Sequence, residues 1–215
     1  MKIKNIIPKE RINKHIKEFI QSTKRSPSGH NQAFADPGAY LNAYDDIISK
    51  ALGKGVKGVS GNYYEHVLPY YPHTDYNSKF DNVYNAAIPL ILPETPVGLV
   101  VFDQRWENDS ALWTMEHSKK FISEFVSSTV DLKEGKPNDY DITNKTNKEI
   151  DDALYNNYLH HYRKEDLYGL SGSFFSYEIG DILVFDNKNI HCTSYFEGKK
   201  LGLSIRFKII EEDYG

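Results

Sequence analysis

Short runs of β-branched and aromatic residues, separated by Gly, Pro and Asn, fill most of the chain beyond Val56 and constrain its fold more than any other feature. Runs of this kind, bounded by turn residues, are typical of β-strands. We expect strands at residues 62–68, 83–92, 98–102, 173–177, 182–185, 190–196 and 201–210. Many short strands in one chain predict a β-sandwich or a jelly roll.

Helices are expected before and within this β region. The first ends near the Ser-Pro-Ser-Gly breaker at residues 26–29, and the second begins at an Asp36-Pro37 cap and stops at Gly53. Their apolar stripes are Ile12, Ile16, Phe19 and Ile20, and Leu41, Tyr44, Ile48 and Leu52. Two further helical stretches are expected at 113–125 and 150–162. We therefore divide the chain into a helical segment at 1–55 that packs on the sheet and a β core at 56–215 with a helical insertion near 105–170.

Composition excludes several classes of function. The 215 residues are 40% hydrophobic and 26% charged, which suits one soluble globular domain, and 26 Lys and Arg against 30 Asp and Glu leave no basic field for nucleic acid or an anionic membrane. No apolar run has the length of a signal peptide or a membrane span, and the single cysteine, Cys192, suits a reducing compartment, so we expect a cytoplasmic protein. Any bound metal must be held by His, Asp or Glu.

The triplet His73-Thr74-Asp75 follows a strand-like run, and residues two apart on an extended chain point to the same side. About one such triplet is expected by chance in a chain of this composition, so a third ligand has to support it. The segment at 180–187 is predicted to be a turn, a buried strand and a second turn that delivers His191 to the start of the next strand. Two histidines and one carboxylate on one side of a metal leave three positions open, as in non-haem Fe(II) oxygenases, whereas zinc prefers a more closed tetrahedral set.

In this pattern the chain resembles the Fe(II)/2-oxoglutarate-dependent oxygenases, and among them the prolyl-hydroxylase-like branch. The likeness consists of the His73-Thr74-Asp75 motif, a Gly-Asp-x-x-x-Phe strand at 180–185, His191, and a basic residue further on; it covers 61–75 and 180–207, with 83–102 in support. The resemblance implies a double-stranded β-helix (a cupin-like jelly roll) that binds Fe(II) through His73, Asp75 and His191. It also implies a dioxygenase that uses 2-oxoglutarate and O2 to hydroxylate a substrate, with release of succinate and CO2.

The resemblance requires a cation for the distal carboxylate of 2-oxoglutarate, and both Lys200 and Arg206 are candidates. If Glu197-Gly198 is a two-residue hairpin turn, alternation places Lys200, Gly202, Ser204 and Arg206 on the face of His191, and Leu201, Leu203, Ile205 and Phe207 on the other. Because the family holds this carboxylate deep in the barrel, Lys200 is its expected partner. Arg206 would then contact the metal-bound end of the co-substrate, brace Asp75 or bind an anionic substrate; a wider turn would exchange the two roles.

Two further contacts with 2-oxoglutarate are expected. Tyr63 matches a family tyrosine that hydrogen-bonds the co-substrate, although a slip of one residue would replace it by Tyr64. Ser204 is expected beside it from its place on the shared face.

The other histidines have simpler explanations: His15, His30 and His117 are expected to be exposed, His66 to pair across the sheet, and His160-His161 to form a solvated face. Cys192 should point away from His191 into a core. Two rival functions remain open. One is a cupin-like metal isomerase or lyase; the other is a non-catalytic jelly-roll binding module, which separations above about 6 Å between the three ligands would favour. A small molecule or a peptide is the expected substrate, and the oligomeric state is left open.

Overall fold

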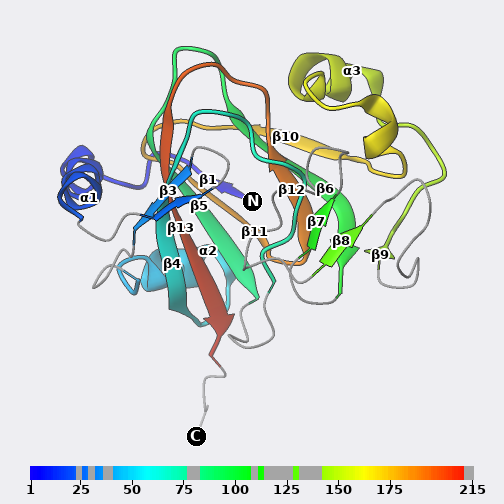
Figure 1. The fold of residues 1–215 in the computed structure, drawn as a ribbon. Helices are drawn as coiled ribbons and strands as arrows, with labels where there is room; N and C mark the ends of the chain where they lie inside the picture. Colours follow the sequence, from blue (N-terminus) through cyan, green and yellow to red (C-terminus); the bar gives the residue numbers. More distant parts are fainter. Residues whose placement is uncertain are drawn as a thin grey trace, which may run out of the picture.

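The computed structural model of the protein describes residues 1–22, 26–28, 32–35, 41–76, 83–107, 111–113, 128–130 and 142–210. Mainly antiparallel sheets form its centre, with helices on the outside (Figure 1). The helical elements are α1 (Lys9–Gln21), α2 (Asp45–Leu52), α3 (Asp152–Leu154), a π-helical turn (Tyr155–Leu159) and a 3-10 turn (Lys164–Leu167). The strands are β1 (Lys2–Ile3), β2 (Ser26–Ser28), β3 (Gln32–Ala35), β4 (Val56–His66), β5 (Tyr84–Ile91), β6 (Gly98–Trp106), β7 (Ala111–Trp113), β8 (Ser128–Val130), β9 (Ile142–Thr143), β10 (Gly172–Ser176), β11 (Ile182–Asp186), β12 (Asn189–Thr193) and β13 (Lys200–Ile209).

The larger sheet has seven strands in the order β1-β11-β5-β13-β4-β3-β2, with β13 between β4 and β5. Side chains alternate along β13, as they must on any strand. Its apolar set faces outward and forms one core with side chains of α1 and α2, which lie against this sheet in Figure 1. This core contains Leu201, Leu203, Ile205 and Phe207 of β13, Ile12 and Phe19 of α1, Ile48 of α2, and Tyr44, which directly precedes α2. The prediction that these β13 residues pack against outer helices is confirmed.

The smaller sheet runs β10-β6-β12, and β9 pairs with the end of β6. Its outer face packs against α3 and the turns that follow, with Cys192 buried there as expected. A third cluster fills the space between the sheets and includes Leu99, Leu183 and Phe185. From β10 onward, successive strands belong to alternate sheets, so the two sheets wind together. The expected double-stranded β-helix is confirmed.

One prediction about strand pairing is wrong. β12 and β13 do not form a hairpin: β12 pairs with β6 in the smaller sheet, whereas β13 lies in the larger one. Residues 194–199 connect them without forming a strand, which allows the chain to cross from one sheet to the other. Lys200 and Arg206 therefore face His191 across the barrel, and they do not stand beside it on a neighbouring strand.

The helical expectations need several corrections. α2 begins at Asp45, after a turn at 41–44, and the proposed Asp36-Pro37 cap lies outside the described residues. The expected helix at 150–162 is present as α3 and its π-helical turn. The helix expected at 113–125 cannot be followed, because Trp113 ends strand β7 and all of 114–127 lies outside the described residues. The segment 1–55 also contributes β1, β2 and β3 to the larger sheet, so it is not purely helical.

The buried face of α1 differs from the predicted stripe. Ile20 is 64% exposed, whereas His15 is fully buried instead of exposed. The reason is a set of hydrogen bonds: His15 Nδ1 lies 2.8 Å from the hydroxyl of Tyr63, and Nε2 lies 2.6 Å from that of Tyr44. Two phenol partners satisfy both ring nitrogens, which allows an imidazole to replace an apolar residue on this face.

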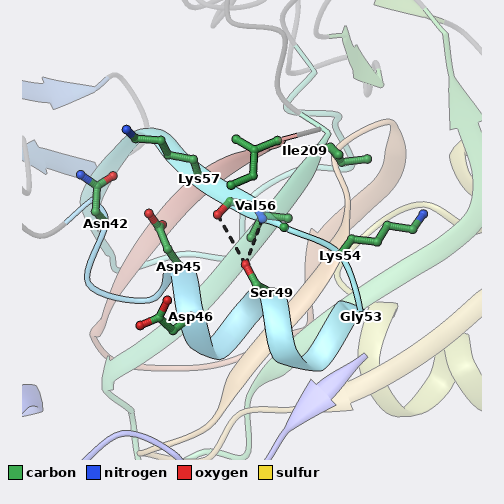
Figure 2. A pocket seen from close by; sticks show the side chains of 11 residues that line it. Asn42, Asp45, Asp46, Ser49, Gly53, Lys54, Val56, Lys57 and Ile209 are labelled. Atoms are coloured by element: carbon green, nitrogen blue, oxygen red, sulfur yellow. Dashed lines mark hydrogen bonds between the residues drawn. The ribbon is translucent and has the colours of Figure 1, made fainter. Parts of the chain in front are cut away.

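A surface hollow of about 740 Å³ is lined by α2, by the segment at 53–57 that follows it and by the end of β13 (Figure 2). Its polar lining serves to attach the helix to β4: Ser49 Oγ accepts a hydrogen bond from the Val56 amide, and Asp45 accepts one from Gly58. None of the predicted metal ligands lines this hollow.

In the part of the chain that the structure describes, no helix is both long enough and apolar enough to cross a membrane.

Candidate metal centre

The two predicted histidine ligands are brought together by backbone pairing. His73 forms an isolated antiparallel bridge with His191, in which each residue's amide donates to the other's carbonyl over 2.9 Å. The residues opposite each other in such a pair point to the same face of the sheet. Their imidazole rings accordingly lie 4.2 Å apart between centroids, inside the barrel. A local motif and a strand more than a hundred residues later thus meet at one edge of the smaller sheet.

Asp75 completes the set. Its Oδ1 lies 3.6 Å from His73 Nε2, and its Oδ2 lies 3.5 Å from His191 Nε2. One ligand atom from each of the three residues lies within 4.8 Å of the others. Metal–ligand bonds of about 2 Å can bridge such separations, so the geometry argues against a binding module in which the three residues fail to converge.

The hydrogen bonds of the imidazoles fix which nitrogen faces the centre. His73 Nδ1 lies 2.8 Å from the carbonyl oxygen of Tyr71, and His191 Nδ1 lies 3.0 Å from that of Asn189. A carbonyl only accepts, so Nδ1 of each ring carries the proton and Nε2 presents a lone pair. Metal-binding histidines are typically held in this way. Burial, with the neighbouring His191, lowers the pKa of His73 to about 4, so this ring is neutral and able to bind a cation at neutral pH.

The Asp75 carboxylate is held by two groups of the larger sheet. Asn85 Nδ2 donates to its Oδ2 over 2.7 Å, and Arg206 Nη2 lies 3.5 Å from its Oδ1. Burial alone would raise the pKa of Asp75, but the Arg206 guanidinium and the two imidazoles hold it well below its usual range. The aspartate is therefore ionised at any physiological pH, as a metal ligand must be.

At the other end of β13, Lys200 is a buried cation with unusual surroundings. Its side chain is only 2% exposed, and Nζ donates to Thr193 Oγ1 over 3.3 Å. The ammonium lies 5.2–5.6 Å from the ring centroids of Tyr64, Tyr177 and Phe196. No carboxylate pairs with it among the described residues, and burial lowers its pKa to about 7. A buried charge without an anionic partner is costly, which points to an anion that arrives with a ligand.

Of the two tyrosines considered for the co-substrate, the structure places Tyr64 and not Tyr63 inside the barrel. Tyr63 points outward, where its hydroxyl donates to Glu18 over 2.9 Å. The expected contact of Tyr63 with 2-oxoglutarate is therefore wrong, because Tyr63 lies on the outer face of β4. The inward-facing residue is its neighbour, Tyr64. Tyr64 lies over Gly202 so closely that a Cβ there would come within 2.4 Å of its ring, so only glycine fits.

The structure also places the remaining candidates. Ser204 lies on β13 between Gly202 and Arg206, on the inner face, in register with Asn62 and Ala87. Sequence reasoning missed Asn85, although a single polar residue in the apolar strand at 84–91 was an available signal. His66 lies next to Tyr64 and Tyr70, at 5.0 and 5.7 Å between ring centroids. His160 is exposed as expected, but His161 is largely covered; His30 and His117 lie outside the described residues.

Comparison with solved structures supports the fold. The epimerase SnoN, in complex with Fe3+, alpha ketoglutarate and nogalamycin RO, matches 97% of this chain and 78% of its own with a TM-score of 0.56 and 9% identity. EctD from S. alaskensis matches 100% of this chain and 76% of its own, with a TM-score of 0.51 and 11% identity. A 2OG-Fe(II) oxygenase family oxidoreductase from Burkholderia pseudomallei matches 93% and 77%, with a TM-score of 0.50 and 9% identity.

At 8–11% identity these likenesses define the fold class, which is the double-stranded β-helix found in 2-oxoglutarate- and iron-dependent enzymes. No protein-family model and no curated protein matches the sequence. The side chains inside the barrel therefore have to indicate a particular activity.

Proposed function

We propose that the protein is an Fe(II)- and 2-oxoglutarate-dependent dioxygenase that hydroxylates a small-molecule or peptide substrate. The observation that carries the proposal is the His73–Asp75–His191 centre, in which both Nε2 atoms and an ionised carboxylate converge while both Nδ1 atoms are tied to carbonyls. Two nitrogens and one oxygen on one side of a metal fit Fe(II) and leave positions open for ligands.

The fit of 2-oxoglutarate is supported by the buried Lys200. Its ammonium suits the distal carboxylate, and the Thr193 hydroxyl, which accepts from Nζ, can donate its own proton to the same group. The rings around Lys200 exclude water from this end of the barrel. A charge-assisted hydrogen bond is stronger where water is excluded, so the deep end favours a carboxylate over a neutral group.

In the proposed reaction the substrate, 2-oxoglutarate and O2 give hydroxylated substrate, succinate and CO2. Bound iron would supply the redox chemistry of oxygen activation, held by His73, Asp75 and His191. The protein supplies position and shielding. Tyr71 and Asn189 carbonyls keep the imidazoles oriented, Asn85 and Arg206 hold Asp75, and Lys200 anchors the co-substrate away from the mouth.

A small-molecule substrate is supported by the neighbouring fold of SnoN, which was crystallised with nogalamycin RO. The test is succinate formation from 2-oxoglutarate by the Fe(II)-loaded protein, with and without a panel of small metabolites and peptides. We expect succinate in the wild type, stimulated by a substrate, and none in His73→Ala or Asp75→Ala. Metal binding without succinate under every condition would favour the isomerase or lyase alternative instead.

A further inference from the structure

Asn85 is a polar residue in an otherwise apolar, buried strand. Its side chain is fully buried, and in the register of the larger sheet it lies opposite Arg206 on β13 and Phe185 on β11. Phe185 belongs to the cluster between the two sheets, so this row of side chains faces the inside of the barrel. Because it lies on the inner face, Asn85 reaches Asp75 from the sheet opposite the two histidines.

The amide of Asn85 has one satisfied and one unsatisfied end. Nδ2 donates to Asp75 Oδ2 over 2.7 Å, and an ionised carboxylate can only accept, which fixes the amide orientation. Oδ1 then points elsewhere; it is buried and has no hydrogen-bond partner among the described residues. An unpaired buried carbonyl lowers stability, so the stability of the fold does not explain why an asparagine occupies this position.

A second buried amide side chain, that of Gln104, differs from Asn85 because all of its polar groups are hydrogen-bonded. Gln104 on β6 is also fully buried, and all of its groups are used: Nε2 donates to the Asn144 carbonyl over 2.7 Å and to Ser171 Oγ over 3.2 Å, and Oε1 accepts from the Ser171 amide over 2.8 Å. Gln104 therefore stabilises the chain around it. Asn85 contacts the metal ligand and leaves its other end unpaired.

We infer that Asn85 is a positioning residue for the metal centre: it holds one oxygen of Asp75 so that the carboxylate presents its other oxygen to the metal, at the expense of fold stability. Groups that orient metal ligands in this way affect affinity strongly even though they never contact the ion. The inference rests on the proposed metal centre. It adds a residue that acts on the metal through Asp75, and it predicts opposite effects on metal affinity and on stability.

The experiment measures Co(II) affinity by anaerobic calorimetry and the melting temperature of the metal-free protein, for the wild type, Asn85→Leu and Gln104→Leu. Asn85→Leu has nearly the same size and removes the donor. We expect it to bind Co(II) roughly 10- to 100-fold more weakly and to melt at the same temperature as the wild type or higher. Gln104→Leu should melt at a lower temperature and bind Co(II) as tightly as the wild type.

Asn85→Ala serves as a second variant if the leucine disturbs packing, and it should show the same loss of Co(II) affinity. The inference is overturned if either folded Asn85 variant binds Co(II) within about twofold of the wild type, or if Asn85→Leu melts well below it, as a purely structural role requires. If the wild type itself binds no Co(II), the proposed metal centre fails as well. Tight wild-type binding that Asn85 variants retain rejects only the role of Asn85.

Discussion

The two cations of β13, Lys200 and Arg206, lie on the same face of one strand but in opposite surroundings. Lys200 is 2% exposed, is surrounded by aromatic rings and has no carboxylate partner among the described residues. Arg206 has a side chain that is 23% exposed and lies 3.5 Å from the Asp75 carboxylate. At the more exposed Arg206 the barrel already contains a carboxylate for the cation, whereas among the described residues the buried Lys200 has none. This difference supports the proposal that Lys200 binds the distal carboxylate of the co-substrate while Arg206 braces Asp75.

Replacing Lys200 and Arg206 one at a time by methionine tests whether the two cations differ in their roles. The Lys200 variant should show the greatest change in 2-oxoglutarate affinity. Lys200→Met should weaken 2-oxoglutarate binding roughly 100-fold, because a charge-assisted hydrogen bond to a buried carboxylate contributes about 2–3 kcal/mol. Arg206→Met should change the same affinity by less than about fivefold. Anaerobic calorimetry on the Ni(II)-loaded protein measures both. The reverse ranking would exchange the roles of the two residues.

Stability should respond in the opposite direction from affinity. Without 2-oxoglutarate the buried Lys200 ammonium is unpaired, so Lys200→Met should raise the free energy of unfolding by about 1–3 kcal/mol. Urea denaturation of the metal-free protein at pH 6 measures this change. Arg206→Met, which removes a partly exposed group, is the matched control and should have a smaller effect. Marked destabilisation by Lys200→Met would mean that its stem and hydrogen bond matter more than its charge.

The pH dependence of 2-oxoglutarate binding sharpens the assignment further. Burial lowers the pKa of Lys200 to about 7, so the free protein loses this proton as the pH rises above 7, and binding a carboxylate must take a proton back. Affinity should therefore be full below pH 7 and roughly tenfold weaker at pH 8 than at pH 6. Lys200→Arg keeps its charge and should abolish this dependence. A flat wild-type profile from pH 6 to 9 would contradict the buried-lysine account.

The smallest expected effect separates the two neighbouring tyrosines. Tyr64→Phe should weaken 2-oxoglutarate binding a few-fold, because its ring and hydroxyl lie at the Lys200 end of the barrel. Tyr63→Phe should leave that affinity unchanged and lower stability by about 1 kcal/mol, since its hydroxyl bonds Glu18 and His15 outside the barrel. Calorimetry and thermal melting of the two variants distinguish these outcomes. Equal effects of both on binding would mean that the register of β4 is wrong.

The three candidate metal ligands could be predicted from the sequence because each one belongs to a recognisable local pattern. His73 and Asp75 are two residues apart, and His191 follows a buried strand with clear turn signals. The alternation of β13 also predicted which residues face inward. The hairpin between β12 and β13 could not be excluded in the same way, because hydrophobic alternation does not say in which of two sheets a strand lies.

The supporting residues escaped prediction for a related reason. Asn85 meets Asp75 only because β5 lies opposite the smaller sheet, and that contact is tertiary. The choice between Tyr63 and Tyr64 depends on one residue of register, which an irregular strand does not reveal. His15 appeared to be a solvent-facing helix residue because its two phenol partners come from β4 and the segment before α2.

The proposed function requires that His73, Asp75 and His191 hold a metal to which 2-oxoglutarate also binds. The most direct measurement is the visible absorption of the protein on anaerobic addition of Fe(II) and 2-oxoglutarate. We expect a charge-transfer band that needs both additions, is lost in His73→Ala and Asp75→Ala, and requires a much higher 2-oxoglutarate concentration in Lys200→Met. No band in the wild type, or an unchanged band in both alanine variants, would contradict the account.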